Sequence, residues 1–219
     1  MVDVAQAPTV AVLTRAPSHA GKRRIFEGLG VPTDPALLTA LLLDTLDGVL
    51  ATGWRVLVGV EPSTAVDEVR ALLPPAVEVV AQVEGDLGDR MRGLMHTAFA
   101  RGASAVILMG SDLPDLSVDI LQEAARLLGD TPRALVLGPA VDGGYYLVGA
   151  SAVPDIFTGI EWGSAQVLRQ TEAAAAEAGL PCHYVTTLHD VDEPSDLARV
   201  RAARTRAWVK QARAAGRHF

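Results

Sequence analysis

The chain has 219 residues, 49% of them hydrophobic, and a mean hydropathy of +0.25, values that exclude a disordered protein and indicate a globular domain with a large core. No apolar run reaches the roughly 18 residues of a membrane span, and the first ten residues lack the basic start of a signal peptide, so we expect a cytoplasmic protein. The single cysteine, Cys182, excludes an internal disulfide and a cysteine-cluster metal site.

The formal net charge is −7, and the charged residues are distributed unevenly along the chain. Residues 197–219 carry seven basic residues and no acidic one, whereas residues 1–196 carry 12 basic and 26 acidic residues. Apolar residues at helical spacing in this basic segment favour a C-terminal amphipathic helix over 195–219 that docks on the protein, which argues against nucleic acid binding. Those residues are Leu197, Val200, Ala203, Ala207 and Trp208. We expect residues 1–8 to form a frayed leader.

Strand-like and helix-like segments alternate along the chain. Apolar and β-branched runs predict strands over residues 9–13, 55–60, 77–81, 106–110, 134–137, 145–148 and 182–186. Apolar residues at helical spacing predict helices over 35–53, 63–73, 118–128 and 165–178, and a further helix that follows Gly85 and ends near residue 100. We expect Asp34, which precedes Pro35, to cap the first of these helices and Ser164 to cap the helix over 165–178. No internal repeat or linker interrupts the alternation, so we predict one domain, 1–219, with three α/β/α layers around a mostly parallel sheet.

One strand delivers a carboxylate to its own C-terminal end. The apolar run over 106–110 stops at Ser111, Asp112 and Pro114. Ligands of open α/β sheets bind in the crevice outside the carboxyl ends of the strands. An aspartate at this place can also cap a turn or helix, but Ser117 is the better N-cap for the helix that follows. Asp112 is therefore the first candidate for a functional residue.

A basic loop follows the first strand. Residues 18–24, SHAGKRR, combine one glycine with three consecutive cations. Lysine and arginine neutralise phosphate oxygens, and glycine lets the backbone come close, so the loop suits a diphosphate or triphosphate. The loop lacks the Walker pattern, and a solvated surface run is the alternative interpretation.

Two glycine-containing turns are further candidates for ligand contacts. The turn at 85–88, GDLG, opens a helix and offers N–H groups to a base, ribose or phosphate, or it is an ordinary strand-to-helix turn. Asp142, Gly143 and Gly144 lie between two strand-like runs as in a simple hairpin, although a glycine pair also lets a sugar or phosphate lie against the backbone. Of the aromatic residues near these turns, we expect Tyr145 and Tyr146 to alternate, one towards the core and one towards the ligand side, and Trp162 to cover a ligand ring or to pack.

Three carboxylates, Asp190, Asp192 and Glu193, precede the C-terminal segment. Asp190 and Asp192 point the same way if this segment is extended. A second carboxylate that reaches Asp112 would complete a cation site, and Mg²⁺ is typically bound by one or two carboxylates plus substrate phosphates. We therefore expect Mg²⁺, or Mn²⁺, at Asp112 and at one of the two carboxylates Asp190 and Asp192.

Seven motifs, taken together, resemble a bacterial family of GT-A-like transferases long known only as a domain of unknown function. They are TRAP, GKRR, GDLGDR, MGSDLPDL, GPAVDGGYYLVG, EWGSAQVL and DVDEPSDL, and they extend over about residues 10–197. The family is similar to 2-phospho-L-lactate guanylyltransferase and to the molybdenum-cofactor nucleotidyltransferases, and the resemblance implies a nucleotide-diphospho-sugar transferase fold. One departure is that Arg15 and Arg23 stand where members usually have lysine and threonine, so the first loop is built differently.

The resemblance also implies a role for individual residues. Asp112 and Lys22 would be catalytic, and Asp112 and Asp192 would hold the metal ion. The implied nucleotide-binding residues are Thr14, Arg15, Ala16, Lys22, Arg24, Gly85, Asp86, Leu87 and Ser111. The implied acceptor residues are Asp142, Gly143, Gly144, Tyr145 and Trp162.

These inferences predict a Mg²⁺-dependent nucleotidyltransferase, in which a hydroxyl or phosphate of a small acceptor attacks a nucleoside triphosphate and pyrophosphate leaves. A glycosyltransferase with a nucleotide-sugar donor is the first alternative, which the basic loop and the lone strand-end aspartate disfavour. A non-catalytic nucleotide-binding protein is the second, and the altered first loop supports it. A serine hydrolase is disfavoured because the G-x-S-x-G elbow is absent. The base, the acceptor and homo-oligomer formation stay open.

Overall fold

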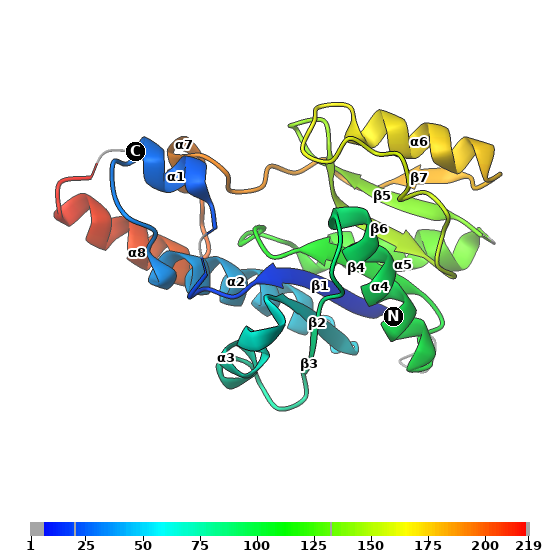
Figure 1. Ribbon diagram of the computed structural model, residues 1–219, viewed down its shortest axis with the longest axis horizontal. Coiled ribbons are helices and arrows are strands. Elements are labelled where there is room, and N and C mark those ends of the chain that lie inside the picture. The colour runs from blue at the N-terminus through cyan, green and yellow to red at the C-terminus, as the bar shows by residue number, and fades with distance from the viewer. Residues whose placement is uncertain (1–6, 20, 132, 218–219) are drawn as a thin grey trace.

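In the computed structural model, which describes residues 7–19, 21–131 and 133–217, seven strands form one sheet in the order β3-β2-β1-β4-β6-β5-β7 (Figure 1). The strands are β1 (Thr9–Arg15), β2 (Val56–Glu61), β3 (Glu78–Ala81), β4 (Val106–Gly110), β5 (Leu135–Pro139), β6 (Tyr145–Ala150) and β7 (Cys182–Tyr184). Neighbouring strands pair in parallel, except that β6 is antiparallel to β4 and β5. The predicted mostly parallel sheet is confirmed.

Helices cover both faces of this sheet. On one face lie α2 (Pro35–Leu50), a short 3₁₀ turn (Ser63–Ala65), α3 (Val66–Leu72) and α5 (Val118–Asp130), and on the other lie α4 (Leu87–Ala100) and α6 (Val167–Glu177). Each face has its own apolar cluster, and β1 contributes Val10 and Val12 to one and Ala11 to the other, as the two-residue period of a strand requires. The three predicted layers are confirmed.

Three further helices form a body beside the layers, which we call the C-terminal lobe. They are α1 (Arg23–Gly28), α7 (Pro194–Leu197) and α8 (Ala203–Ala214), and they gather at one end of α2 (Figure 1). A third apolar cluster holds them together. Its buried members are Ile25, Phe26, Leu37, Leu41, Val191, Leu197, Val200, Trp208, Val209 and Ala212.

Carboxylates of α2 fasten the lobe to the rest of the molecule. Asp44, only 4% exposed, accepts hydrogen bonds of 2.8 Å from both the backbone N–H and the hydroxyl of Thr205. Asp34 caps α2 as predicted, and its second oxygen accepts from the indole N–H of Trp208 over 2.8 Å. Because these acceptors are satisfied by α8, the last helix is held in one place.

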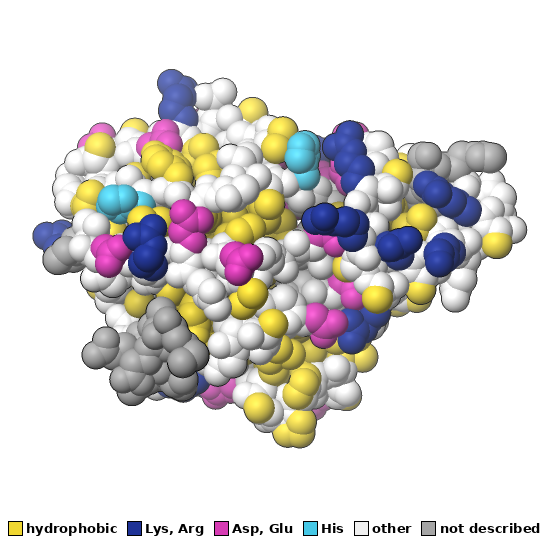
Figure 2. Space-filling model, turned by 180° about the vertical axis from the view of Figure 1, so that it is seen from behind, with side chains coloured by type: hydrophobic (Ala, Val, Ile, Leu, Met, Phe, Trp, Pro, Cys, Tyr) yellow, Lys and Arg dark blue, Asp and Glu magenta, His cyan; other side chains and the backbone are white. Residues whose placement is uncertain are grey.

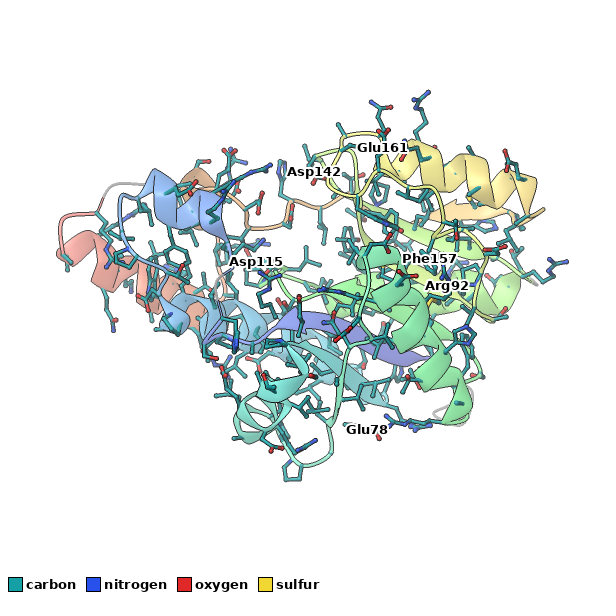
Figure 3. The ribbon with its side chains drawn as sticks, in the orientation of Figure 1. Glu78, Arg92, Asp115, Asp142, Phe157 and Glu161 are labelled. Carbon is teal, nitrogen blue, oxygen red and sulfur yellow. The ribbon has the colours of Figure 1, made fainter. Side chains whose placement is uncertain are left out.

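The predicted continuous helix over 195–219 is wrong, because two helices, α7 and α8, occupy the part of that segment that the structure describes. The carboxylate of Asp115, labelled in Figure 3, accepts hydrogen bonds from the backbone N–H groups of Arg201 and Ala202, over 3.0 and 2.8 Å. In a continuous helix these N–H groups would instead donate to carbonyl groups of the preceding turn. Since α8 begins only at residue 203, Ala203 and Ala207 are exposed instead of facing inward. The buried residues of α8 are Thr205, Trp208, Val209 and Ala212.

Positively charged side chains gather on the outer surface of the C-terminal lobe, at the right of Figure 2. Arg199, Arg201, Arg206 and Lys210, which all belong to the C-terminal segment, are exposed, whereas the apolar face of α8 is buried. The basic segment is therefore amphipathic, as predicted. Among the described residues, none of the helices combines the length and hydrophobicity needed to cross a bilayer.

Two local predictions need correction, and a third concerns residues that lie mostly outside the described part of the chain. Residues 23–28 form α1, although the sequence pattern favoured a loop up to residue 24. Gln166, not Ser164, is the N-cap of α6, and the Ser164 hydroxyl accepts from the Gln166 N–H over 3.2 Å. Of the predicted leader 1–8, only residues 7 and 8 lie within the described part of the chain.

Candidate active site

The C-terminal ends of β1, β2 and β4 open into a cavity of about 380 Å³, which we call the main cleft. These strands are parallel neighbours, so their last residues meet at the same edge. The lining includes Thr14, Arg15, Glu61, Gln82, Leu87, Arg90, Ser111, Asp112, Tyr145 and Asp190. A second cavity of about 270 Å³, the side cavity, shares Thr14, Arg15, Ser111 and Asp112 with it and adds His19, Gly21, Lys22, Leu38 and Asp192.

Asp112 lies between the two cavities, and backbone hydrogen bonds on both sides of it fix its position. The hydroxyl of Thr45 donates to the carbonyl of Ser111 and accepts from the N–H of Leu113, each over 3.0 Å. The N–H of Val191 donates to the carbonyl of Asp112 over 3.1 Å. The end of β4 is thus held by α2 and by the segment that carries Asp190 and Asp192.

Lys22 joins the two predicted metal ligands. Its ammonium lies 2.9 Å from Oδ2 of Asp112 and 3.4 Å from Oδ1 of Asp192, and only 10% of its side chain is exposed. Burial by itself lowers the pKa of Lys22, but the ion pair and hydrogen bond with Asp112 and the charges of Asp192 and Asp190 outweigh it and raise the pKa above the usual value. Lys22 therefore carries its charge in the site.

The other predicted nucleotide-binding residues at the end of β1 and the start of α1 divide into two groups. Arg24 reaches the same site, with its guanidinium 2.8 Å from Oδ2 of Asp192. Thr14 and Arg15 line both cavities. Ala16, in contrast, is fully buried and donates its N–H to the carbonyl of Glu61, so it supports the loop from behind.

Glu61 holds two arginines at the β2 end of the main cleft. Its Oε2 pairs with Arg15, over 3.1 Å, and with Arg90 of α4. The hydrogen bond from Arg90 lowers the pKa of Glu61, partial burial opposes it, and Arg15 lowers the pKa further, so that the value lies below the usual 4.5. Arg90 also donates from Nε to the carbonyl of Gly85 over 3.2 Å. Glu61 thereby links β1, β2 and the turn before α4.

Gln82, which follows β3, presents an oriented amide to the main cleft. Its Nε2 donates both hydrogens, to the carbonyl of Thr14 over 2.9 Å and to the carbonyl of Gly59 over 2.8 Å. Gly59 leaves room for this arrangement, since a Cβ there would lie 2.9 Å from Leu94 and 3.3 Å from the Gln82 side chain. With its donors occupied, Gln82 offers the cleft a hydrogen-bond acceptor, Oε1.

The residues of the GDLG turn, 85–88, differ in whether they reach the main cleft. Leu87 is 45% exposed and lines the main cleft. Asp86 is the N-cap of α4 and accepts from the N–H of Asp89 over 2.8 Å, so its carboxylate is used locally. Gly85 has a φ of +124°, which glycine adopts readily. Neither Gly85 nor Asp86 is among the residues that line the main cleft.

The hairpin between β5 and β6 has the predicted turn at Asp142 to Gly144. Asp142 accepts from the N–H of Gly144 over 2.9 Å and is exposed, on the hairpin side of the molecule in Figure 3. Gly143, at φ +91°, packs so closely that a Cβ would lie 2.4 Å from the carbonyl oxygen of Ala165. The hairpin tip is therefore fixed against the segment that leads into α6.

The aromatic residues divide between cleft and core. Tyr145 and Tyr146 both line the main cleft, where we expected one of them to face a ligand. Tyr146 donates its hydroxyl to the carbonyl of Thr186 over 2.7 Å, and burial raises the pKa of both tyrosines. Trp162 packs into the second apolar cluster, against Gly88 of α4, and is not among the residues that line the cleft.

Asp190 and Asp192 occupy different places. Asp190 lines the main cleft, and burial raises the pKa of its carboxyl; Lys22 opposes the shift, and Asp142 and Asp192 add to it. Asp192 lines the side cavity and shares Lys22 with Asp112. Of the two predicted alternatives, Asp192 is the carboxylate that converges with Asp112 on one point.

The donor set at that point suits a hard divalent cation. Two carboxylate oxygens already contact one cationic group, the Lys22 ammonium, and the side cavity leaves room for oxygen ligands from a substrate or water. Among the described residues, no group of three or more His, Cys, Asp or Glu side chains is arranged to hold a metal. Asp112 and Asp192 would therefore hold Mg²⁺ only together with non-protein ligands.

Residues 45–164 match the model of a family described as "Uncharacterized protein conserved in bacteria (DUF2064)". No curated protein matches the chain. Among solved structures, a candidate nucleotide-diphospho-sugar transferase from Desulfovibrio desulfuricans G20 is 30% identical, with a TM-score of 0.83 over 94% of this chain and 95% of that one.

Two more distant structures share the fold alone. A nucleotidyl transferase from Methanothermobacter thermautotrophicus is 19% identical, with a TM-score of 0.65 over 91% of this chain and 99% of that one. A CMP:2-keto-3-deoxy-manno-octonic acid synthetase, solved in complex with CTP, is 13% identical, with a TM-score of 0.56 over 94% and 99%. The fold is thus that of nucleotide-diphospho-sugar transferases.

Proposed function

This chain belongs to the bacterial DUF2064 family, and we propose that it is a nucleotidyltransferase that depends on a divalent cation. The proposed reaction joins the nucleotidyl group of a nucleoside triphosphate to a hydroxyl or phosphate of a small acceptor and releases pyrophosphate. The observation that carries the proposal is the convergence of Asp112 and Asp192 on the Lys22 ammonium, with Arg24 beside Asp192, at the C-terminal edge of the sheet.

In this proposal the side cavity receives the phosphates. Lys22, Arg15 and His19 line it, and Arg24 lies beside Asp192 at its wall. Positive groups at fixed positions stabilise negative charge that develops on phosphate oxygens, and phosphoryl and nucleotidyl transfers depend mainly on such positioning and charge stabilisation. No protein nucleophile is needed, because the acceptor supplies the attacking oxygen.

The main cleft receives the nucleoside part. It shares Thr14, Arg15, Ser111 and Asp112 with the side cavity, so we propose that one extended ligand occupies both. Gln82 offers an acceptor to a base N–H group, and Leu87 and Met91 offer apolar contact. We propose that the acceptor enters from the side of Tyr145 and the hairpin. The bound divalent cation would supply Lewis-acid charge to the phosphates, and Asp112 and Asp192 would hold it.

The similar structures support this proposal. One protein of the same fold was solved with CTP, and another is named a nucleotidyl transferase. A second candidate function is transfer of a sugar from a nucleotide sugar, which the 30% identical candidate nucleotide-diphospho-sugar transferase favours. The two functions share the nucleotide site but differ in the bond that breaks, at the α phosphate or at the anomeric carbon.

The test is thermal unfolding with Mg²⁺ and ATP, GTP, CTP, UTP or nucleotide sugars, followed by assays of pyrophosphate and nucleoside diphosphate release with a panel of sugar phosphates and polyols. Wild type is compared with Asp112→Asn, which keeps the side-chain shape, and with Asp130→Asn, a matched change of an exposed aspartate on α5. We expect a triphosphate to stabilise wild type and Asp130→Asn but not Asp112→Asn.

Pyrophosphate release by wild type, lost in Asp112→Asn, would support nucleotidyl transfer. Release of a nucleoside diphosphate from a nucleotide sugar would replace the proposal by glycosyl transfer. If neither nucleotides nor nucleotide sugars stabilise the protein, the proposed function is wrong.

A further inference from the structure

Lys22 occupies the point at which the two candidate cation ligands meet. Its ammonium is 2.9 Å from Asp112 and 3.4 Å from Asp192, distances at which one positive charge serves two carboxylates. The three residues come from the first loop, the end of β4 and the segment before α7. The side chain of Lys22 is 10% exposed, whereas those of the two aspartates are 39% exposed, so the ammonium is the most enclosed member of the group.

The backbone around Lys22 is built to hold it in this place. Lys22 is the N-cap of α1 with a φ of +49°, a left-handed conformation that residues other than glycine seldom adopt. The next turn of α1 buries Ile25 and Phe26 in the apolar cluster of the C-terminal lobe. Because α1 is anchored through these two side chains, the Lys22 ammonium is directed at the aspartates and not into solvent.

The two aspartates are held just as firmly. Val191, buried in the C-terminal lobe, donates its N–H to the carbonyl of Asp112 and so ties the two acidic segments together. The carboxylate of Asp196 accepts from the N–H groups of Asp192 and Glu193, over 3.1 and 2.8 Å. These hydrogen bonds keep the two acidic segments side by side.

We propose that Lys22 is the resident counter-cation of Asp112 and Asp192, and that a divalent cation enters this site only by displacing the Lys22 ammonium from between the two carboxylates. An ammonium and a metal ion cannot occupy the same point, and two carboxylates stripped of a cation repel each other. The displaced ammonium remains in a cavity lined by Arg15 and His19, where phosphate oxygens are its natural partners.

This exchange has a thermodynamic consequence. The divalent cation alone binds weakly, because its entry breaks the two Lys22 ion pairs. A triphosphate gives Lys22 a new partner, so cation and nucleotide strengthen each other's binding by the same factor. The inference rests on the proposed function only in taking a divalent cation as the ion that enters.

The first test uses wild-type protein and its two lysines, Lys22 and Lys210. Lys210 is exposed on α8 and serves as an internal reference. The protein is acetylated with an N-hydroxysuccinimide ester, with EDTA or with increasing Mg²⁺ or Mn²⁺ and no nucleotide, and the two sites are quantified by mass spectrometry. We expect Lys22 to react much more slowly than Lys210 in EDTA and severalfold faster at saturating metal, with Lys210 unchanged. Metal that binds without accelerating Lys22 would overturn the proposal.

The second test measures metal affinity directly, by the electron paramagnetic resonance signal of free Mn²⁺. Lys22→Met, which removes the ammonium but keeps an unbranched side chain, should bind Mn²⁺ about tenfold more tightly than wild type. It should also unfold at a lower temperature in EDTA and regain the difference with Mg²⁺. The control is Arg23→Gln, which changes an 85% exposed cation on the same helix and should leave both properties as in wild type.

A double variant keeps the test decisive if Lys22→Met folds poorly. Lys22→Met with Asp192→Asn removes the repulsion between the carboxylates and one metal ligand together, so it should fold in EDTA and lose the gain in Mn²⁺ affinity. Equal Mn²⁺ affinity of wild type and Lys22→Met would overturn the exchange even if the protein transfers nucleotides. Conversely, tighter binding in Lys22→Met with no nucleotide response of the wild type would leave the exchange standing and remove the proposed function.

Discussion

The side-chain amide of Gln82 donates to the backbone carbonyl of Thr14 over 2.9 Å and thereby joins the residue after β3 to the C-terminal end of β1, at the wall of the main cleft. The same nitrogen also donates to Gly59 over 2.8 Å, so the amide has one orientation. A flipped amide would set its oxygen against two carbonyl oxygens. The cleft thus has a hydrogen-bond acceptor that does not depend on the mobility of a long side chain.

We expect Gln82→Met to raise the KM for the nucleoside triphosphate about tenfold, with a smaller effect on kcat, because the variant keeps the side-chain length but loses the oriented acceptor. Gln82→Glu should be worse, since it sets a carboxylate against the carbonyls of Thr14 and Gly59. Steady-state kinetics with each triphosphate would check this. Glu84→Gln, an exposed neighbour, is the control, and an unchanged KM in Gln82→Met would exclude Gln82 from nucleotide recognition.

The stability conferred by Glu61 should depend on pH. Its pairs with Arg90 and Arg15 hold the pKa of Glu61 in the folded protein below the usual 4.5. A depressed folded pKa means that the stabilisation is fully present above about pH 4.5 and is lost as the pH falls through the folded value. In urea unfolding, wild type should exceed Glu61→Gln at neutral pH by a margin that is constant down to about pH 5 and shrinks in more acidic solution. A margin that grows on acidification would contradict this.

Removal of the Asp44 carboxylate should loosen the C-terminal lobe. Asp44→Ala leaves the N–H and hydroxyl of Thr205 without their acceptor in a buried place, which we expect to cost about 3 kcal/mol of unfolding free energy. Asp47→Ala is the matched control, because its carboxylate pairs with Arg204 but is 61% exposed, and it should cost less than about 1 kcal/mol. Denaturant titrations of both variants would measure the difference, and equal costs would refute the argument.

Gly143→Ala should destabilise the hairpin by more than backbone conformation alone explains. Both Gly143 and Gly102 have positive φ, +91° and +84°, but a Cβ at 102 meets nothing within 4 Å, whereas one at 143 would lie 2.4 Å from the Ala165 carbonyl. Gly102→Ala should therefore cost about 1 kcal/mol, from the left-handed backbone alone, and Gly143→Ala at least twice that. The difference between the two variants in thermal unfolding measures the cost of the steric contact with Ala165. Similar losses of stability in both variants would show that the hairpin can move to relieve this contact.

The layers of the fold could be predicted because they depend on local patterns. Val106 to Gly110 is a continuous apolar run with a proline shortly after it, and the observed β4 has these same bounds. Asp34 with Pro35, and Ser117, have the chemistry of helix N-termini and occupy the N-termini of α2 and α5. The short helix α1 was not predicted, because its six residues bury only Ile25 and Phe26, too few to establish a helical period.

The chemistry of the site was harder to foresee. Asp112 was identifiable because strand ends are where open α/β sheets bind ligands. Glu61 and Gln82 were not recognised, although each stands at or just after the end of a predicted strand, because nothing local indicates that Arg90 or the Thr14 carbonyl lies opposite. The contact between Lys22 and Asp192 joins residues 170 positions apart and depends on α1 and α7 sharing one apolar cluster. No spacing rule expresses such a relationship.

The hydrogen bonds that hold the C-terminal lobe set the order in which parts of the protein can fold during synthesis. Asp34, Asp44 and Asp115 leave the ribosome long before Arg201, Thr205 and Trp208, the residues that satisfy them. Until those donors emerge, the apolar side of α2 that carries Leu37 and Leu41 lacks the cover that α8 supplies, and Asp192 has not yet come to Asp112. The nascent chain therefore exposes an apolar surface while the site is still incomplete. Docking of the C-terminal segment, late in synthesis, covers that surface and completes the site.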